Sequence, residues 1–115
     1  MSVRIFHNPK CSKSRATLEL LRERGLEPEI IEYLINPPTL QELSSILEML
    51  QMQPRDLMRK KEASYREARL DDQSLDHQSL IQAMVDHPIL IERPIVLCNG
   101  RAVLGRPPES VLDFL

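Results

Sequence analysis

The chain has 115 residues, of which 42% are hydrophobic and 28% charged, a composition that supports one hydrophobic core and excludes wholesale disorder. A net charge of −2, the absence of Trp and the presence of only two Tyr and two Phe argue against a nucleic-acid-binding surface. No apolar run approaches the roughly 20 residues that cross a bilayer, and no signal-peptide core follows the first residue. We therefore predict a cytoplasmic protein without a membrane segment.

The first third of the sequence predicts a strand, a helix and a second strand. Short β-branched and aromatic runs indicate the strands, and an apolar pattern with helical spacing lies between them and ends at Gly25. Two strands joined by one helix are expected to be parallel. The expected elements are a strand over residues 3–6, a helix from residue 11 or 12 to residue 24, and a strand over residues 30–34.

The middle of the sequence predicts a block of helices. Thr39 and Glu42 have the spacing of a capping box, in which each side chain binds the backbone N–H of the other residue. Asp76 is placed to cap a later helix. The expected segments are a helix after Thr39 through Leu50, a short piece from Pro54 through Met58, polar helix and loop over residues 59–72, and a helix between Asp76 and His87.

The last third predicts a hairpin followed by a helix. Asn99-Gly100 lies between the apolar runs 95–98 and 101–104, which is a strong signal for a type I′ turn. A helix is expected after Pro107, because proline suits the first helical turn. The order βαβ, helical block, ββα predicts an α/β protein of the thioredoxin-like fold, with a four-stranded mixed sheet and a helical insertion.

Cys11 stands where the first strand meets the first helix. The helix dipole and the unpaired N–H groups of the first turn stabilise a thiolate there, and Lys10, Lys13 and Arg15 add positive charge. The same N–H groups are suited to an oxyanion. We therefore interpret Cys11 as a reactive thiol at the ligand-binding edge of the sheet rather than an inert buried one.

The remaining cysteine and the histidines argue against a dithiol redox site and against a metal site. Ser14 occupies the place of the second thiol in a Cys-x-x-Cys motif, so a dithiol oxidoreductase of the usual kind is not expected. Cys98 is interpreted as a half-buried strand residue rather than a resolving thiol. Two cysteines and three histidines without ligand spacing predict no metal site.

Three arginines are candidate ligands for an anion. Arg93 and Arg106 each precede a proline at a strand end, which favours extended geometry and a fixed side-chain direction. Arg59 follows the short helical piece. Guanidinium groups bind phosphate-like oxyanions through paired hydrogen bonds. Any one of these arginines, taken alone, is better explained as a solvated surface charge than as an anion ligand. The site is predicted because all three are expected to converge near Cys11.

Four segments carry a further signal: residues 7–15 (HNPKCSKSR), 32–39 (EYLINPPT), 87–96 (HPILIERPIV) and 105–109 (GRPPE). Together, over nearly the whole chain, they resemble the arsenate reductases that are coupled to glutathione and glutaredoxin. The resemblance implies the thioredoxin-like fold that the element order also predicts.

This resemblance implies a single domain over residues 1–115 that acts as a monomer. Residues 1–35 and 89–115 would form the thioredoxin-like core, and residues 36–88 the helical insertion. Pro94 corresponds to the position at which this fold keeps a cis proline beside the site.

The resemblance also implies roles for four residues near the first helix. Cys11 corresponds to the nucleophile that forms an adduct with arsenate, and His7 to the histidine that helps to hold this cysteine as a thiolate. Ser14 and Arg15 correspond to residues that stabilise the thiolate and the oxyanion.

In the same way, Arg59, Arg93 and Arg106 correspond to the arginines that bind arsenate and arsenite. Glutathione is then the co-substrate, glutaredoxin reduces the mixed disulfide, and no bound cofactor is implied. Arsenic detoxification is the expected role.

Two departures from the family pattern leave alternatives open. Ser12-Lys13 replaces a Gly-Thr pair, and Glu92 replaces an asparagine beside Arg93, where a carboxylate reduces the positive charge of the anion site. One alternative is a glutathione-linked thiol oxidoreductase or transferase without arsenate activity. The other is a redox-sensing regulator that binds RNA polymerase, although such sensors typically carry the second thiol that Ser14 replaces.

Overall fold

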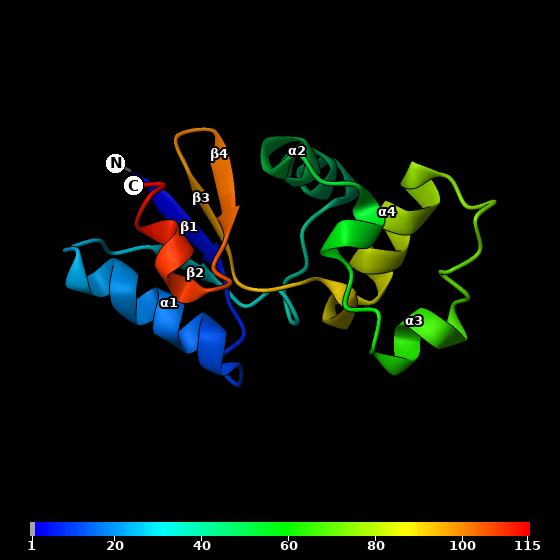
Figure 1. Ribbon diagram of the computed structural model, residues 1–115, viewed down its shortest axis with the longest axis horizontal. Coiled ribbons are helices and arrows are strands. Elements are labelled where there is room, and N and C mark those ends of the chain that lie inside the picture. The colour runs from blue at the N-terminus through cyan, green and yellow to red at the C-terminus, as the bar shows by residue number, and fades with distance from the viewer. Residues whose placement is uncertain (1) are drawn as a thin grey trace. The chain divides into compact units, whose positions relative to one another are not determined.

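The strands and helices follow one another in the predicted order in the computed structural model, which describes residues 2–115 (Figure 1). The chain folds into two compact units. The first unit contains the residues up to Asn36 together with Arg93–Leu115, and the second contains Pro37–Glu92. Over residues 2–115, none of the helices has the length and apolar character that crossing a membrane requires.

The first unit is built on a four-stranded mixed sheet. Its elements are β1 (Val3–Phe6), α1 (Ser12–Glu23), β2 (Glu29–Ile31), β3 (Ile95–Cys98), β4 (Arg101–Leu104) and the 3₁₀ turn η3 (Pro108–Val111). The strand order is β2-β1-β3-β4, in which β1 is parallel to β2 and antiparallel to β3, and β3 is antiparallel to β4. The predicted fold class is therefore confirmed.

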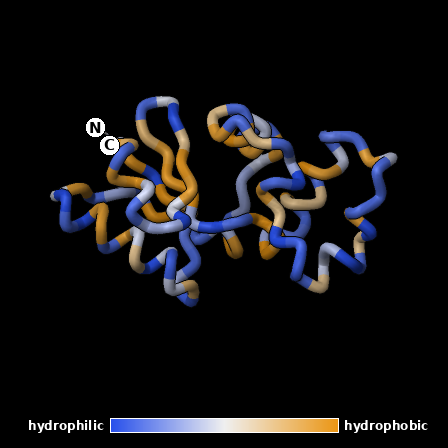
Figure 2. Tube along the Cα trace, in the orientation of Figure 1, coloured by the Kyte–Doolittle hydropathy of each residue, from blue (hydrophilic) through white to orange (hydrophobic). Residues whose placement is uncertain are grey.

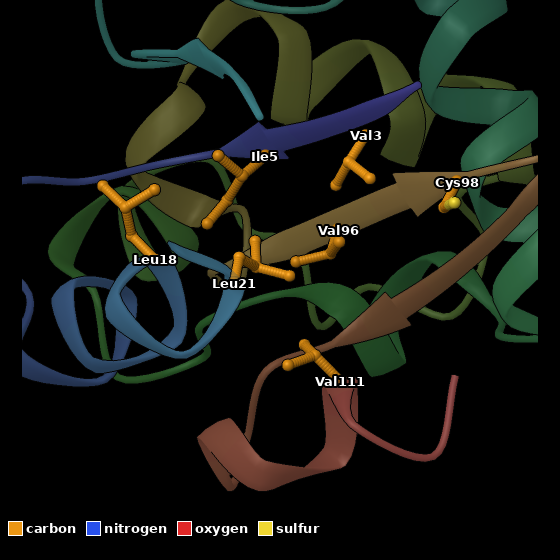
Figure 3. Packing of buried hydrophobic residues seen from close by; sticks show 7 residues of the cluster. All are labelled: Val3, Ile5, Leu18, Leu21, Val96, Cys98 and Val111. Carbon is orange, nitrogen blue, oxygen red and sulfur yellow. The ribbon is translucent and has the colours of Figure 1, made fainter. Parts of the chain in front are cut away.

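The core of this unit lies between the sheet and the segments α1 and η3, which contact each other (Figure 1). Alternate residues of β1 and β3 point to one face of the sheet, where they meet the apolar stripe of α1 (Figure 3). The cluster consists of Val3, Ile5, Leu18, Leu21, Val96, Cys98 and Val111. Figure 2 shows the same apolar runs along the strands. Helix α1 is thus fixed to the sheet through Leu18 and Leu21.

The hairpin between β3 and β4 confirms the turn predicted from the sequence. Asn99 and Gly100 have positive φ angles of 53° and 73°, as a type I′ turn requires. Cys98 and Arg101 pair directly beside the turn. A two-residue connection therefore sets the register of both strands.

The second strand lies earlier than the predicted range of 30–34. The His7 N–H donates to the Ile31 carbonyl over 2.8 Å, at the point where β1 has ended. Beyond this bond β1 offers no further residues for pairing, and the chain turns so that the Ile35 N–H donates to the Glu32 carbonyl. The length of β1 therefore limits β2, in spite of the β propensity of the residues that follow.

The helix expected after Pro107 is a single 3₁₀ turn, η3. The N–H groups of Ser110 and Leu112 donate to the carbonyls three residues before them, on Pro107 and Glu109. This spacing is that of a 3₁₀ helix. Pro107 is the N-cap residue and Pro108 the first helical residue, positions whose N–H groups have no partner within a helix, so the prolines start the turn without weakening it.

The second unit consists of the predicted helices and a 3₁₀ turn, η2 (Pro88–Leu90), that was not predicted. The predicted elements are α2 (Leu40–Leu50), the 3₁₀ turn η1 (Pro54–Leu57), α3 (Ala63–Glu67) and α4 (His77–Asp86). The Thr39 Oγ1 accepts from the Glu42 N–H and the Glu42 carboxylate accepts from the Thr39 N–H, both over 3.1 Å. Asp76 accepts from the Ser79 N–H over 2.8 Å. Both predicted caps are confirmed.

Residues 89–92 belong to the second unit, whereas we expected them in the thioredoxin-like core. Backbone hydrogen bonds attach this segment to the residues around the end of η1. The Arg59 N–H donates to the Leu90 carbonyl over 2.7 Å, and the Glu92 N–H donates to the Leu57 carbonyl over 2.8 Å. These pairings move the boundary to the residue that follows Glu92.

Replacing Thr39 by alanine is expected to lower the free energy of unfolding by about 1 kcal/mol, because α2 loses its side-chain cap. Urea denaturation followed by circular dichroism measures this difference. Thr39→Ser keeps the capping oxygen and is expected to retain most of the stability. An alanine variant as stable as the parent would show that the capping box contributes nothing.

Candidate functional site

Cys11 lies at the N-terminal end of α1, directly after the turn that follows β1. It is the N-cap residue, with extended φ and ψ angles of −96° and 123°. The turn is held by the Cys11 N–H, which donates to the Asn8 carbonyl over 3.0 Å, and by the Lys10 N–H, which donates to Asn8 Oδ1 over 3.0 Å. These bonds keep the thiol partly exposed at the start of the helix.

The surroundings of Cys11 favour its thiolate. Partial burial alone would raise the pKa of the thiol. A larger opposite effect comes from the Ser14 N–H, from the hydrogen bond and charge of Arg93, and from the Lys13 N–H. The pKa therefore lies below its ordinary value. The amide donors belong to the first turn of α1, as the sequence predicts. The cation that contributes most comes from the distant Arg93 rather than from the neighbouring lysines that we emphasised.

Arg93 and Arg106 lie together in the first unit. The Arg106 Nη1 donates to the Arg93 carbonyl over 3.0 Å, so one predicted anion ligand holds the backbone of the other. The Gly105 N–H donates to the Pro94 carbonyl over 3.0 Å. The Arg93–Pro94 bond is cis, as predicted, and the Arg106–Pro107 bond is also cis. The two Arg-Pro segments are therefore joined to each other and reach Cys11 through Arg93.

His7 is buried and connects to Cys11 through Ser14. The His7 Nδ1 lies 2.6 Å from the Ser14 Oγ, which also accepts the Asn8 N–H over 3.1 Å. The Ser14 backbone N–H in turn stabilises the Cys11 thiolate. His7 is only 6% exposed and Ser14 is fully buried, so the hydroxyl holds both the ring and the turn in one arrangement. The contact with Ser14 is thus a route by which His7 reaches the first turn of α1, and its role in holding the thiolate stays a prediction.

The free energy of unfolding is expected to fall as the pH falls below about 6.5, the ordinary value for histidine, because of His7. Burial is the largest influence and lowers the pKa of His7; the charge of Glu32 raises it, the charges of Arg22 and Arg15 lower it, and the net shift is downward. Below pH 6.5 the unfolded chain therefore binds a proton that the folded chain does not, and the folded state loses stability until the pH reaches the lower folded pKa.

Urea unfolding across this pH range measures the dependence, with His7→Asn as the matched variant. The variant is expected to lose this part of the pH slope. An equal slope in both proteins would show that His7 does not cause it.

Arg15 supports the loop that presents Cys11. It is exposed, and its Nη1 donates to the Pro9 carbonyl over 2.9 Å. Its backbone N–H donates to the Cys11 carbonyl over 3.0 Å. Because a guanidinium has five N–H donors, others remain for an oxyanion beside Cys11, and that role stays a prediction.

Arg59 belongs to the second unit, where two carboxylates bind its guanidinium. Its Nη1 lies 2.8 Å from Glu92 Oε1 and its Nε lies 3.3 Å from Glu62 Oε1. Burial lowers the pKa of Arg59, but the two carboxylates together raise it by more, so the net shift is upward. Glu92 thus pairs with Arg59, and its expected effect on Arg93 stays a prediction. The convergence of Arg59 with Cys11 stays a prediction.

Two residues near the site were given no role from the sequence, although Gly105 opens the segment 105–109. Thr17, on the second turn of α1, is fully buried, and its hydroxyl faces the backbone of Gly105. The signals that were available are a threonine on an otherwise apolar helix face and a glycine between a strand and an Arg-Pro pair. Neither signal indicates which residues meet in space.

The arrangement in the first unit is suited to nucleophilic attack by sulfur on an oxyanion. A thiolate stands at a helix N-terminus, with amide donors and the charge of Arg93 directed at it. Among residues 2–115, no group of three or more His, Cys, Asp or Glu side chains is placed to hold a metal ion.

Comparison with known proteins agrees with this description. The sequence model of the ArsC family matches residues 6–114. The uncharacterised protein YfgD of Escherichia coli K12 is 54% identical over 114 residues, which cover 98% of this chain and 96% of YfgD. A protein named arsenate reductase from Neisseria meningitidis serogroup B is 51% identical over 110 residues, which cover 95% and 94% of the two chains.

A solved structure extends the likeness to three dimensions. The structure titled as an arsenate reductase from Vibrio cholerae has a TM-score of 0.97 and 52% identity, and the match covers 100% of this chain and 98% of the other. Sequence and structure thus agree over nearly the full length of the relatives. The chain belongs to the ArsC family.

Proposed function

We propose that the protein is an arsenate reductase in which Cys11 is the nucleophile. The observation that carries the proposal is the Cys11 thiol, whose pKa is lowered by the first-turn amides and by Arg93. Membership of the ArsC family and the names of relatives at about half identity support arsenate as the substrate.

The reaction begins when the Cys11 sulfur forms a bond to arsenic and one arsenate oxygen leaves as water, while arsenic stays pentavalent. An external thiol then attacks the Cys11 sulfur and forms a disulfide with it. The electron pair of the As–S bond passes to arsenic, which becomes trivalent and leaves as arsenite. A further thiol attacks this mixed disulfide and returns Cys11 to the thiolate. The two external thiols supply the two electrons that arsenic gains.

In this scheme each of the other residues has a separate task. Arg93, Arg106 and Arg59 bind the oxyanion, and Arg15 and the first-turn amides stabilise the charge on its oxygens. His7 and Ser14 are positioning residues that hold the first turn against the sulfur.

Glutathione is the external thiol that we propose, and glutaredoxin the protein that reduces the mixed disulfide. A single activated cysteine supports this choice, because Cys98 is buried in the core and Ser14 stands where a resolving thiol would lie. The cytoplasm, where glutathione keeps thiols reduced, is then the compartment.

The test measures NADPH oxidation and arsenite formation with arsenate, glutathione, glutaredoxin and glutathione reductase. We expect arsenate-dependent oxidation, an equal amount of arsenite, and dependence on glutaredoxin. Turnover with thioredoxin and its reductase alone would keep arsenate reduction and overturn the glutaredoxin coupling. A folded protein that forms no arsenite with either system would overturn the activity itself.

A second candidate is a glutathione-linked thiol enzyme that does not use arsenate. The contact that favours it is the Arg59–Glu92 ion pair, because a carboxylate at 2.8 Å competes with an oxyanion for the guanidinium. Exchange of Cys11 with glutathione disulfide, in a protein that forms no arsenite, would support this candidate. Failure of Cys11 to form a mixed disulfide with glutathione would exclude it.

A further inference from the structure

Helix α1 and the segment that carries Arg106 lie close to each other at Gly105. A Cβ atom on this residue would lie 2.5 Å from Thr17 Oγ1 and 2.8 Å from Pro94 Cγ. Real Cβ atoms do not approach other atoms within 3.0 Å, so a side chain at this position would force the helix or the proline to move. The glycine is required here by the closeness of the two segments.

Thr17 connects this contact to the first turn of α1. Its Oγ1 donates to the Lys13 carbonyl over 2.8 Å, and the Gly105 carbonyl lies 3.4 Å from the same oxygen. The N–H of Lys13 is one of the donors that stabilise the Cys11 thiolate. One buried hydroxyl thus faces both the turn that binds the sulfur and the chain next to Arg106.

Gly105 connects the same contact to Arg93. The Gly105 N–H donates to the carbonyl of Pro94, the residue after Arg93, and the Arg106 guanidinium donates to the Arg93 carbonyl, both over 3.0 Å. The backbone that carries the Arg93 side chain is therefore held on one side by Gly105 and on the other by Arg106.

We propose that Thr17 and Gly105 are positioning residues, whose contact fixes the separation between the first turn of α1 and the Arg93 segment. The helix amides and the Arg93 guanidinium then reach the Cys11 sulfur at the same time. A side chain at Gly105 separates these two groups, and the thiolate loses the contribution of Arg93. The inference rests on the proposed function only in treating Cys11 as the nucleophile, and its test needs no arsenate.

The test measures the pKa of Cys11 from the pH dependence of its alkylation by iodoacetamide, with Cys98→Ala in every protein so that one thiol reacts. Gly105→Ala and Thr17→Val are expected to raise this pKa and to slow alkylation at pH 7 about three- to tenfold. Thr17→Ser keeps the hydroxyl and is expected to react like the parent. Circular dichroism confirms that each variant is folded.

A second measurement separates positioning from a general loss of structure. In an Arg93→Gln background, Gly105→Ala is expected to raise the Cys11 pKa little further, because the group that it displaces is already absent. The full increase in that background, or an unchanged pKa in a folded Gly105→Ala protein, would overturn the proposal. If Gly105→Ala does not fold, the Thr17 variants decide, and equal pKa values for valine and serine would overturn it.

Failure of this proposal and failure of the proposed function are distinguishable. The alkylation rates report the thiol alone, whereas arsenite formation reports the reaction. A protein that forms no arsenite but shows the expected pKa changes would retain the positioning role and lose only the substrate.

Discussion

Replacing Cys11 by serine is expected to lower arsenate-dependent turnover by at least about three orders of magnitude. The environment that lowers the pKa of the thiol cannot ionise a hydroxyl at neutral pH, and oxygen cannot form the mixed disulfide that the scheme requires. The measurement is arsenite formation with the complete reducing system. Circular dichroism shows whether the serine variant is folded.

The matched control is Cys98→Ser. Cys98 is 6% exposed and packs in the core cluster of the first unit, so its replacement is expected to lower stability while leaving most of the turnover. A folded Cys11→Ser protein that forms arsenite, or a folded Cys98→Ser protein that forms none, would show that the nucleophile has been assigned to the wrong cysteine.

Replacing Arg93 by glutamine is expected to lower kcat/KM for arsenate by about 10²- to 10³-fold. Arg93 acts twice in the proposed reaction, because it stabilises the Cys11 thiolate by hydrogen bond and charge and also binds the oxyanion. The second effect depends on the paired donors of a guanidinium, so Arg93→Lys is expected to recover only part of the loss.

The pH profile distinguishes the two effects of Arg93. The arginine lowers the pKa of Cys11, so Arg93→Gln is expected to move the acidic limb of kcat/KM to higher pH. Arg24→Gln, which removes an exposed arginine at the other end of α1, is the control and is expected to leave both rate and profile unchanged. An acidic limb that does not move in Arg93→Gln would contradict the contribution to the thiolate.

The parts of the fold that could be predicted from the sequence depend on residues close together in the chain. Thr39 with Glu42, and Asn99 with Gly100, determine a cap and a turn locally, and both are confirmed. The extent of β2 depends instead on the length of a strand more than 20 positions earlier. The ends of a strand such as β2 are set by its pairing with another strand, which local β propensity does not reveal.

The candidate site likewise has a part that depends on neighbouring residues and could be predicted, and a part that depends on residues far apart in the chain. The position of Cys11 at a helix N-terminus could be predicted from the order of strand and helix. Its amide donors could be predicted too, because they belong to the residues that follow it directly in the chain. The contacts of Arg93 with Cys11 and of Thr17 with Gly105 join residues about 80 to 90 positions apart. Sequence patterns named Arg93 as a candidate but did not reveal that it acts on the thiol.

The first unit is built from two stretches of the chain that are separated by the second unit, and this affects the protein during its synthesis. β1 pairs with β3, and the whole second unit lies between them in sequence, so the central pairing closes a very long loop. During synthesis from the N-terminus, Cys11 is therefore made long before Arg93. Until the hairpin of β3 and β4 has docked, the nascent thiol lacks the hydrogen bond and charge of Arg93 and has only the first-turn amides of α1 to stabilise its thiolate. The Cys11 thiol thus reaches its full reactivity only after the second unit has been synthesised and β3 has paired with β1.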